Sequence, residues 1–214
     1  MTAGRQIISQ SQEWCTPKKY VDAINYFFDN NIDLDPCSNK YSIVPAHNKI
    51  MLPNNGLILD WNFKNIYVNP PYGIDKLRKT TIKMWLKKCY ESNLNYGAEV
   101  IALIPVAPNT SHWKEYIWGG ADAICFLYDT RLKFMVMGQD CLKGAPMACC
   151  LIYWGARKQD FHKLFINFGA VVQLDTLKAQ LIGKAQDRNC QVSYTNKKQV
   201  KINNTNIGLF DAML

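Results

Sequence analysis

Three short, largely apolar runs, each followed within two residues by a proline, constrain the fold of this chain most strongly. They are residues 32–34, 66–68 and 100–104, which lead into Asp35-Pro36, Asn69-Pro70-Pro71 and Pro105. Proline has no backbone N–H and cannot extend a hydrogen-bonded ladder, so each run is predicted to be a strand that stops there. The third run is apolar throughout, which is typical of a buried strand in a parallel sheet.

Segments with helical spacing separate these strands. Thr16 followed by Pro17 is typical of a helix start, with a capping hydroxyl and a proline at the first helical position, and it predicts a helix over 17–29. Strands that alternate with helices predict an α/β sheet, and the closely spaced later strands predict a hairpin-like end. Further helices are predicted at 75–92, 110–118 and 158–168, and further strands at 121–128, 131–137 and 147–154.

The length of 214 residues favours one compact domain with an appendage. Residues 1–12 are predicted to be a flexible tail, 13–155 the main domain, and 156–214 a C-terminal extension with a helix and a small hairpin or tail. A hydrophobic fraction of 48% excludes a disordered chain. The sequence carries no signal for oligomeric state.

The cysteines indicate a reducing compartment. The eight cysteines are scattered without a C-x-x-C pair, and the three histidines lie far apart, so no zinc spacing occurs. The N-terminus lacks an apolar signal core, and no apolar run reaches the length of a membrane span. We therefore expect a cytoplasmic protein without a bound metal and without a membrane partner.

The charge is compatible with a polyanionic partner. Twenty-five Lys and Arg against seventeen Asp and Glu give a net charge of +8. Such an excess attracts nucleic acid, although it equally serves solubility.

Arg131 and Lys133 alternate with Leu132 and Phe134, which predicts two cations on one face of a strand. There they would either contact a DNA backbone or protect a sheet edge from aggregation. Arg78 and its neighbouring lysines are predicted to form the exposed face of the helix at 75–92.

The tetrapeptide Asn69-Pro70-Pro71-Tyr72, directly after a predicted strand, carries the most specific chemistry. An exocyclic amine on an aromatic ring is a poor nucleophile because its lone pair is delocalised. The Asn69 amide oxygen and the Pro70 carbonyl can accept its hydrogens and draw the lone pair out of the ring, while the prolines fix the loop. Tyr72 offers an aromatic face to a base that has left its stack. The same residues also form ordinary turns.

The order of these and other motifs resembles the phage and prophage Dam-like DNA N6-adenine methyltransferases over residues 13–154. The matching motifs are Trp14-Cys15-Thr16-Pro17, Asp33 to Ser38, Gly56-Leu57 with Trp61, Asn69 to Gly73, Trp85, Pro105, Asn109-Thr110 with Trp113, Arg131 to Phe134, and Ala145-Pro146 with Trp154. The resemblance implies a Rossmann-like, S-adenosylmethionine-dependent methyltransferase sheet with helices on both faces. Residues 13–155 would then be the catalytic domain, and the protein would act in the cytoplasm of a bacterial cell or a phage-infected host.

The resemblance also implies roles for individual residues. It places S-adenosylmethionine against six of them: Trp14, Thr16, Pro17, Asp35, Pro36 and Ser38. Trp14 can equally anchor the helix entry, and Asp35 can equally cap the next loop. The sequence lacks three features that such enzymes commonly have. Residues 35–40 contain no glycine, whereas many methyltransferases have a glycine-rich loop there. Asn55 stands where the family has an acidic residue before Gly-Leu, with Asp60 as a substitute for a ribose contact, and Val106 to Pro108 lack the Arg that the family commonly has.

The function expected from the sequence is transfer of a methyl group from S-adenosylmethionine to N6 of a flipped adenine in double-stranded DNA. Asn69, Pro70, Pro71 and Tyr72 are the predicted catalytic residues, and Arg131 and Lys133 the predicted DNA contacts. The chemistry of the loop equally permits N4 of cytosine, an RNA base or a protein glutamine amide. A non-catalytic DNA-binding module is the alternative from another class.

Overall fold

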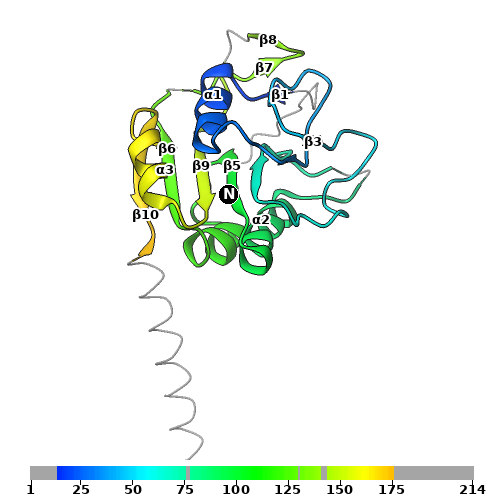
Figure 1. Ribbon diagram of the computed structural model, residues 1–214. Helices are drawn as coiled ribbons and strands as arrows, with labels where there is room; N and C mark the ends of the chain where they lie inside the picture. The colour runs from blue at the N-terminus through cyan, green and yellow to red at the C-terminus, as the bar shows by residue number, and fades with distance from the viewer. Residues whose placement is uncertain (1–13, 76–77, 130, 141–143, 176–214) are drawn as a thin grey trace, which may run out of the picture. The chain divides into compact units, whose positions relative to one another are not determined.

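The computed structural model describes residues 14–75, 78–129, 131–140 and 144–175 (Figure 1). Contacts divide the chain into two units, residues 1–174 and 175–214, and the fold below is that of the first unit. The predicted tail at 1–12 and the predicted hairpin or tail near the C-terminus lie outside the described residues.

A seven-stranded mixed sheet forms the centre of this unit, so the α/β prediction is confirmed. Its strand order is β10-β6-β9-β5-β4-β2-β3. The strands β3, β2, β4 and β5 are parallel to one another, whereas β9 is antiparallel to both β5 and β6, and β10 is antiparallel to β6. The strands are β2 (Leu34–Asp35), β3 (Asn48–Lys49), β4 (Asn65–Val68), β5 (Glu99–Pro105), β6 (Ala123–Leu127), β9 (Cys149–Trp154) and β10 (Gly169–Gln173).

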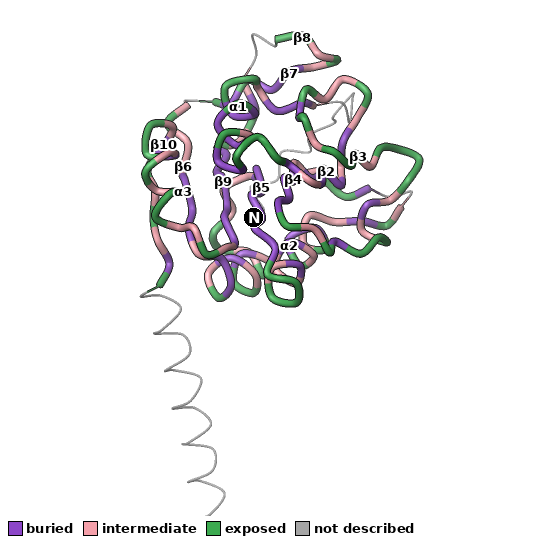
Figure 2. Tube along the Cα trace, viewed as in Figure 1, coloured by how far each residue is buried: buried purple, intermediate pink, exposed green. Residues whose placement is uncertain are grey.

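Helices cover both faces of the sheet. They are α1 (Lys18–Phe27), α2 (Ile82–Tyr96), α3 (Lys158–Phe165) and the π-helix η1 (Trp113–Trp118). Successive side chains of a strand point to opposite faces. Tyr153 therefore stacks on Phe161 of α3, while the neighbouring Trp154 donates to the Tyr116 carbonyl of η1. Figure 2 shows that β4, β5 and β9 are buried along most of their length.

A second, three-stranded sheet joins the N-terminal segment to a distant part of the chain. Strand β1 (Trp14–Cys15) pairs antiparallel with β7 (Met135–Val136), and β7 pairs with β8 (Gln139–Asp140). The Trp14 ring stacks on Phe134 at 5.2 Å between centroids. Residues 14–17 are thus held beside the segment that contains Arg131 and Lys133.

Several element boundaries differ from the sequence predictions. The helix predicted at 75–92 begins only at Ile82, because Asp75 and Thr80 exchange backbone hydrogen bonds of 3.0 and 3.2 Å and close a turn. The strand predicted at 131–137 is shorter in the structure, where only residues 135–136 of this range pair with β1. The main domain was predicted to end at residue 155. In the structure, α3 and β10 beyond that residue belong to it, because α3 contacts β6 and β10, and β10 pairs with β6.

The first helix lies where it was predicted, but its cap was predicted wrongly. Pro17 is the N-cap residue of α1, and no side chain caps the helix. The Thr16 hydroxyl lies 2.6 Å from the Tyr67 hydroxyl and accepts a hydrogen bond from Asn69 instead. Contacts with a distant strand have therefore replaced the local capping bond.

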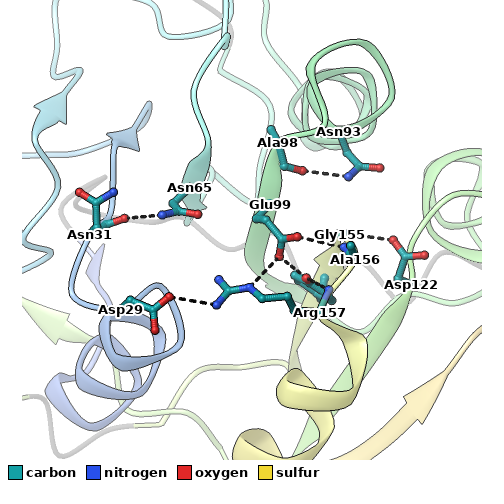
Figure 3. A network of polar contacts seen from close by, with 11 residues as sticks. Asp29, Asn31, Asn65, Asn93, Ala98, Glu99, Asp122, Gly155, Ala156 and Arg157 are labelled. Atoms are coloured by element: carbon teal, nitrogen blue, oxygen red, sulfur yellow. Dashed lines mark hydrogen bonds and ion pairs between the residues drawn. The ribbon is translucent and has the colours of Figure 1, made fainter.

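A buried polar network joins β5 and β9 at the end where β5 begins (Figure 3). Glu99 accepts hydrogen bonds from the Tyr153 hydroxyl and from the Ala156 backbone at 3.0 Å, and Arg157 Nε lies 3.5 Å from its carboxylate. Arg157 also pairs with Asp29 at 3.1 Å. These partners compensate the buried carboxylate, since a buried charge is costly when it is unpaired.

Within the described part of the chain, no helix is long and apolar enough to cross a membrane.

Candidate active site

A crevice is expected where the strand order of a parallel sheet changes direction. The chain passes from β2 to β3 on one side and later returns to β4 on the other side of β2. The loops after β2 and β4 therefore diverge at the carboxyl end of the sheet, which is where such sheets bind ligands. Asp35 ends β2, and Asn69 follows β4 directly.

The Asp35 carboxylate is buried at this crevice, with 3% of its surface exposed. Its oxygens accept hydrogen bonds from the Cys37 backbone at 3.3 Å and from the Ser42 hydroxyl at 3.5 Å. Burial raises the pKa of the carboxyl to about 6, although these hydrogen bonds, Ser38 and the charge of Lys49 oppose the rise. A ligand that brings a positive charge or hydroxyl donors would compensate this burial.

A cavity of about 370 Å³ opens beside Asp35. Its walls are the loop after β2, including Pro36 and Ser38, the residues after β3, including Met51, and Pro71 of the loop after β4. The volume lies in the range of small-molecule sites, which combine apolar walls with a few polar groups. Apolar side chains together with a few polar and cationic ones line the cavity, which fits an amphipathic ligand.

Gly56 brings the loop after β3 against the loop after β2. A Cβ atom on Gly56 would lie 2.0 Å from the Pro36 carbonyl oxygen, so no other residue fits without moving the backbone. The Gly56 carbonyl accepts a hydrogen bond of 2.8 Å from the buried Trp61 indole. Gly56 and Trp61 of the sequence motif therefore shape the cavity wall. Asp60, the suggested ribose contact, accepts a hydrogen bond from Tyr96 and does not line this cavity.

The loop after β4 is fixed by contacts with three other segments. The Asn69 side-chain nitrogen donates to the Thr16 hydroxyl at 3.3 Å. The Asn69 backbone forms a hydrogen bond that lowers the pKa of the Cys37 thiol, although burial raises this pKa overall. Pro70 is buried, and Pro71 reaches the cavity. The catalytic candidates thus lie beside the cavity wall.

Tyr72 belongs partly to the hydrophobic core. Its hydroxyl donates to the Leu103 carbonyl at 3.2 Å, and its ring meets Phe134 edge to face at 5.9 Å between centroids. Phe134 is in turn stacked against Trp14. These contacts fix the plane of the Tyr72 ring.

The structure separates the six predicted cofactor residues into groups. Pro36 and Ser38 line the cavity, and Asp35 is buried directly before them. Thr16 contacts Asn69 and Tyr67, and Trp14 stacks on Phe134. The half-buried Pro17 accepts backbone hydrogen bonds from the first turn of α1. Only part of the predicted set therefore surrounds one cavity.

The two predicted DNA contacts are exposed, and the residues that alternate with them are buried. Leu132 and Phe134 are 2% and 3% exposed. The alternation of inward and outward side chains is confirmed, although residues 131–134 do not form a ladder. Because Phe134 contacts Tyr72, the Arg131 and Lys133 side chains start close to the predicted catalytic loop.

Arg78 is a candidate binding residue that the sequence interpretation missed. The segment predicted as helix is a turn here, and the prediction that Arg78 lies on an exposed helix face is wrong. Its guanidinium donates to the buried Asp75 carboxylate at 2.6 Å and lines the cavity. Thr80-Thr81, directly before the apolar Ile82, could have revealed the true helix start.

Among the described residues, no group of three His, Cys, Asp or Glu side chains could hold a metal ion.

A family model described as DNA N-6-adenine-methyltransferase (Dam) matches residues 6–201. No curated protein and no solved structure matches the chain. The matched range includes the crevice, the cavity walls and the segment with Arg131 and Lys133.

Proposed function

Because the chain belongs to the DNA N-6-adenine-methyltransferase family, we propose that it transfers the methyl group of S-adenosylmethionine to a flipped adenine in double-stranded DNA. The observation that carries this proposal is the position of the Asn69-Pro70-Pro71 loop. It follows β4, next to the end of β2, and Pro71 forms part of the cavity wall. A base in this loop and a cofactor in the cavity would therefore be neighbours.

The cavity beside Asp35 is the proposed cofactor site. S-adenosylmethionine supplies an electrophilic methyl group on a positively charged sulfur when it is bound. The Asp35 carboxylate would hold the ammonium group or the hydroxyls of this ligand, and Pro36 and Ser38 would contact it from the cavity wall. The parallel block β3-β2-β4-β5 and its reversal at β2 support a Rossmann-like architecture for this site.

The loop after β4 is the proposed site of the adenine. The Asn69 amide oxygen and the Pro70 carbonyl would accept the two hydrogens of the N6 amine and increase its nucleophilicity. The base would stack on the Tyr72 ring, whose plane the contacts with Leu103 and Phe134 fix. Removing a base from the duplex costs a few kcal/mol, which such stacking and hydrogen bonding offset.

A methylation assay tests the proposal directly. Purified protein is incubated with unmethylated double-stranded DNA and labelled S-adenosylmethionine, and the nucleosides are then analysed by mass spectrometry. N6-methyladenine is the expected product. N4-methylcytosine would overturn the choice of base. Absence of transfer to DNA, with cofactor binding intact by calorimetry, would overturn the DNA substrate and lead to RNA and protein glutamine substrates. Firm DNA binding without any cofactor binding would favour a non-catalytic module.

Arg131 and Lys133 are the proposed contacts to the DNA backbone. Replacing both with alanine is expected to weaken DNA binding and to lower the slope of log K against log salt concentration by about two, because two phosphate contacts are lost. Fluorescence anisotropy at several salt concentrations measures this slope. Lys163→Ala on α3, where Lys163 pairs with Asp160, is the matched control and should leave the slope unchanged. An unchanged slope in the double variant would contradict the assignment.

A further inference from the structure

We propose that Thr16 is a positioning residue that sets the direction of the Asn69 side-chain amide, so that its oxygen and not its nitrogen faces the amine to be methylated. This inference rests on the proposed function and deepens it. It also differs from the cofactor contact expected for Thr16, which does not line the cavity beside Asp35.

The geometry consists of two consecutive contacts, which join the half-buried Asn69 to the buried Thr16 and Tyr67. The Asn69 side-chain nitrogen donates to Thr16 Oγ1 at 3.3 Å, and the same oxygen lies 2.6 Å from the Tyr67 hydroxyl. Thr16 is 3% exposed and Tyr67 is 1% exposed. Tyr67 belongs to β4, two residues before Asn69, so the central sheet itself holds the end of this chain of contacts.

An amide side chain has a donor end and an acceptor end of nearly the same shape, so its surroundings must determine which end points where. A hydroxyl oxygen has two lone pairs and one hydrogen. If Tyr67 donates to Thr16, one lone pair remains for Asn69, and if Thr16 donates to Tyr67, both remain. In either case Thr16 can accept from the Asn69 nitrogen, as it does here. When Thr16 donates its one hydrogen to Tyr67, it has none left for the amide oxygen, which is then directed elsewhere.

The direction of the amide decides whether the loop can act on an amine. With its nitrogen bonded to Thr16, Asn69 presents an acceptor to the N6 hydrogens. A reversed amide would present its own N–H groups to those hydrogens, and two sets of donors repel each other. Within the described part of the chain, the Asn69 oxygen accepts no hydrogen bond. This oxygen therefore retains its lone pairs for a substrate.

The absence of a cap at α1 is an independent observation. A threonine directly before a proline at a helix start normally bonds to the backbone of the first turn. Here no side chain caps α1, so the Thr16 hydroxyl is committed to Asn69 and Tyr67. Replacing this hydroxyl therefore removes no capping bond and mainly affects the two partners.

The decisive experiment compares Thr16→Val with Thr16→Ser in the full chain. Valine keeps the shape and removes the hydroxyl, so kcat for DNA methylation is expected to fall by about 10- to 100-fold, the cost of a misplaced reacting group. The Kd for S-adenosylmethionine, measured by calorimetry, should change less than about twofold because the cavity is untouched. Serine restores the hydroxyl and should return kcat to within about threefold of the original protein.

A double-variant cycle separates positioning from other effects. In the Asn69→Ala background there is no amide to orient, so adding Thr16→Val should lower kcat no further. A parallel loss of cofactor affinity and kcat in Thr16→Val would overturn the proposal in favour of direct cofactor contact. A kcat equal to that of the original protein would overturn it as well, because Asn69 would then be oriented without Thr16.

A spectroscopic measurement tests the contact without any turnover. In ¹⁵N-labelled protein without ligands, the Asn69 side-chain amide signals are identified by their absence in Asn69→Ala. These signals should shift in Thr16→Val and remain near their original position in Thr16→Ser. Signals that do not move would overturn the proposal. If they shift as expected but the original protein methylates no adenine, the proposed function fails while the positioning contact stands.

Discussion

Replacing Asn69 with alanine is expected to lower kcat for adenine methylation by about 100- to 1,000-fold, comparable to removing one preorganised hydrogen-bonding group from an active site. The Asn69 oxygen is the side-chain acceptor proposed for the N6 amine, and alanine offers none. Cofactor affinity should stay within about twofold, because Asn69 does not line the cavity. Steady-state kinetics on a DNA duplex and calorimetry with S-adenosylmethionine measure the two quantities.

Two controls accompany this variant. The Asn69 side chain makes one hydrogen bond, of 3.3 Å, to another described residue, so its loss should cost no more than about 1 kcal/mol of stability. Thermal unfolding checks that value. Asn95→Ala removes the same side chain from an exposed position on α2 and should leave kcat unchanged. Full activity in Asn69→Ala would refute the role of the loop in catalysis.

Replacing Asp35 with asparagine is expected to weaken S-adenosylmethionine binding by about 10- to 100-fold and, at the same time, to stabilise the ligand-free protein at neutral pH. A hydrogen bond to a charged group contributes about 1.5–3 kcal/mol, which sets the size of the affinity loss. Calorimetry at pH 7.5 measures it. The two effects have opposite directions because the buried carboxylate is unfavourable for folding until a ligand compensates its charge.

The stability effect has a defined pH dependence. Burial raises the pKa of the Asp35 carboxyl from 3.8 to about 6, so folding favours the neutral carboxyl. Its contribution to stability is fully present below about pH 4 and is lost as the pH rises through about 6. At 1.36 kcal/mol per pKa unit, the ionised carboxylate costs at most about 3 kcal/mol above pH 7. Asparagine does not ionise and should recover up to that amount.

Urea unfolding of both proteins at pH 4.5 and pH 8 measures this difference. The stability gain of Asp35→Asn should be large at pH 8 and small at pH 4.5. An equal gain at both values would contradict the role of ionisation, and an unchanged cofactor Kd would contradict the placement of the ligand beside Asp35. Ser42→Ala removes a weaker contact of the same carboxylate and should change both quantities much less.

Local signals in the sequence predicted the parts of the fold that local chemistry determines. Strands β2 and β4 end before Pro36 and Pro70, as expected, because a missing N–H acts at its own position. Strand β5 instead includes Pro105, which pairs with Cys149, and the Val106 N–H still donates to the Ala148 carbonyl. The helix at 17–29 was predicted from its apolar spacing. The strands β3 and β10 were not predicted. Asn48 and Lys49 are both exposed, and β10 depends on pairing with β6, so neither leaves an apolar pattern of its own.

The candidate site likewise has features that the local sequence determines and features that depend on long-range contacts. The position of the Asn69 loop at the end of a strand was predictable, because the motif contains its own strand stop. The contact between Thr16 and Asn69 joins residues 53 apart in the chain, and the local pattern instead favoured a helix cap. Arg78 was misplaced for a similar reason: its ion pair with Asp75 and the turn around it outweigh the helical spacing of the neighbouring side chains.

The Glu99 network and the Asn69 loop occupy opposite ends of two adjacent parallel strands, since Glu99 starts β5 and Asn69 follows β4. The buried polar network and the proposed catalytic loop therefore lie at different ends of the same sheet. Substitutions around Glu99 and Arg157 could therefore be used to raise the stability of the fold without changing the loops that border the crevice. The loops at the other end would remain open to change in cofactor preference or in the base that they accept.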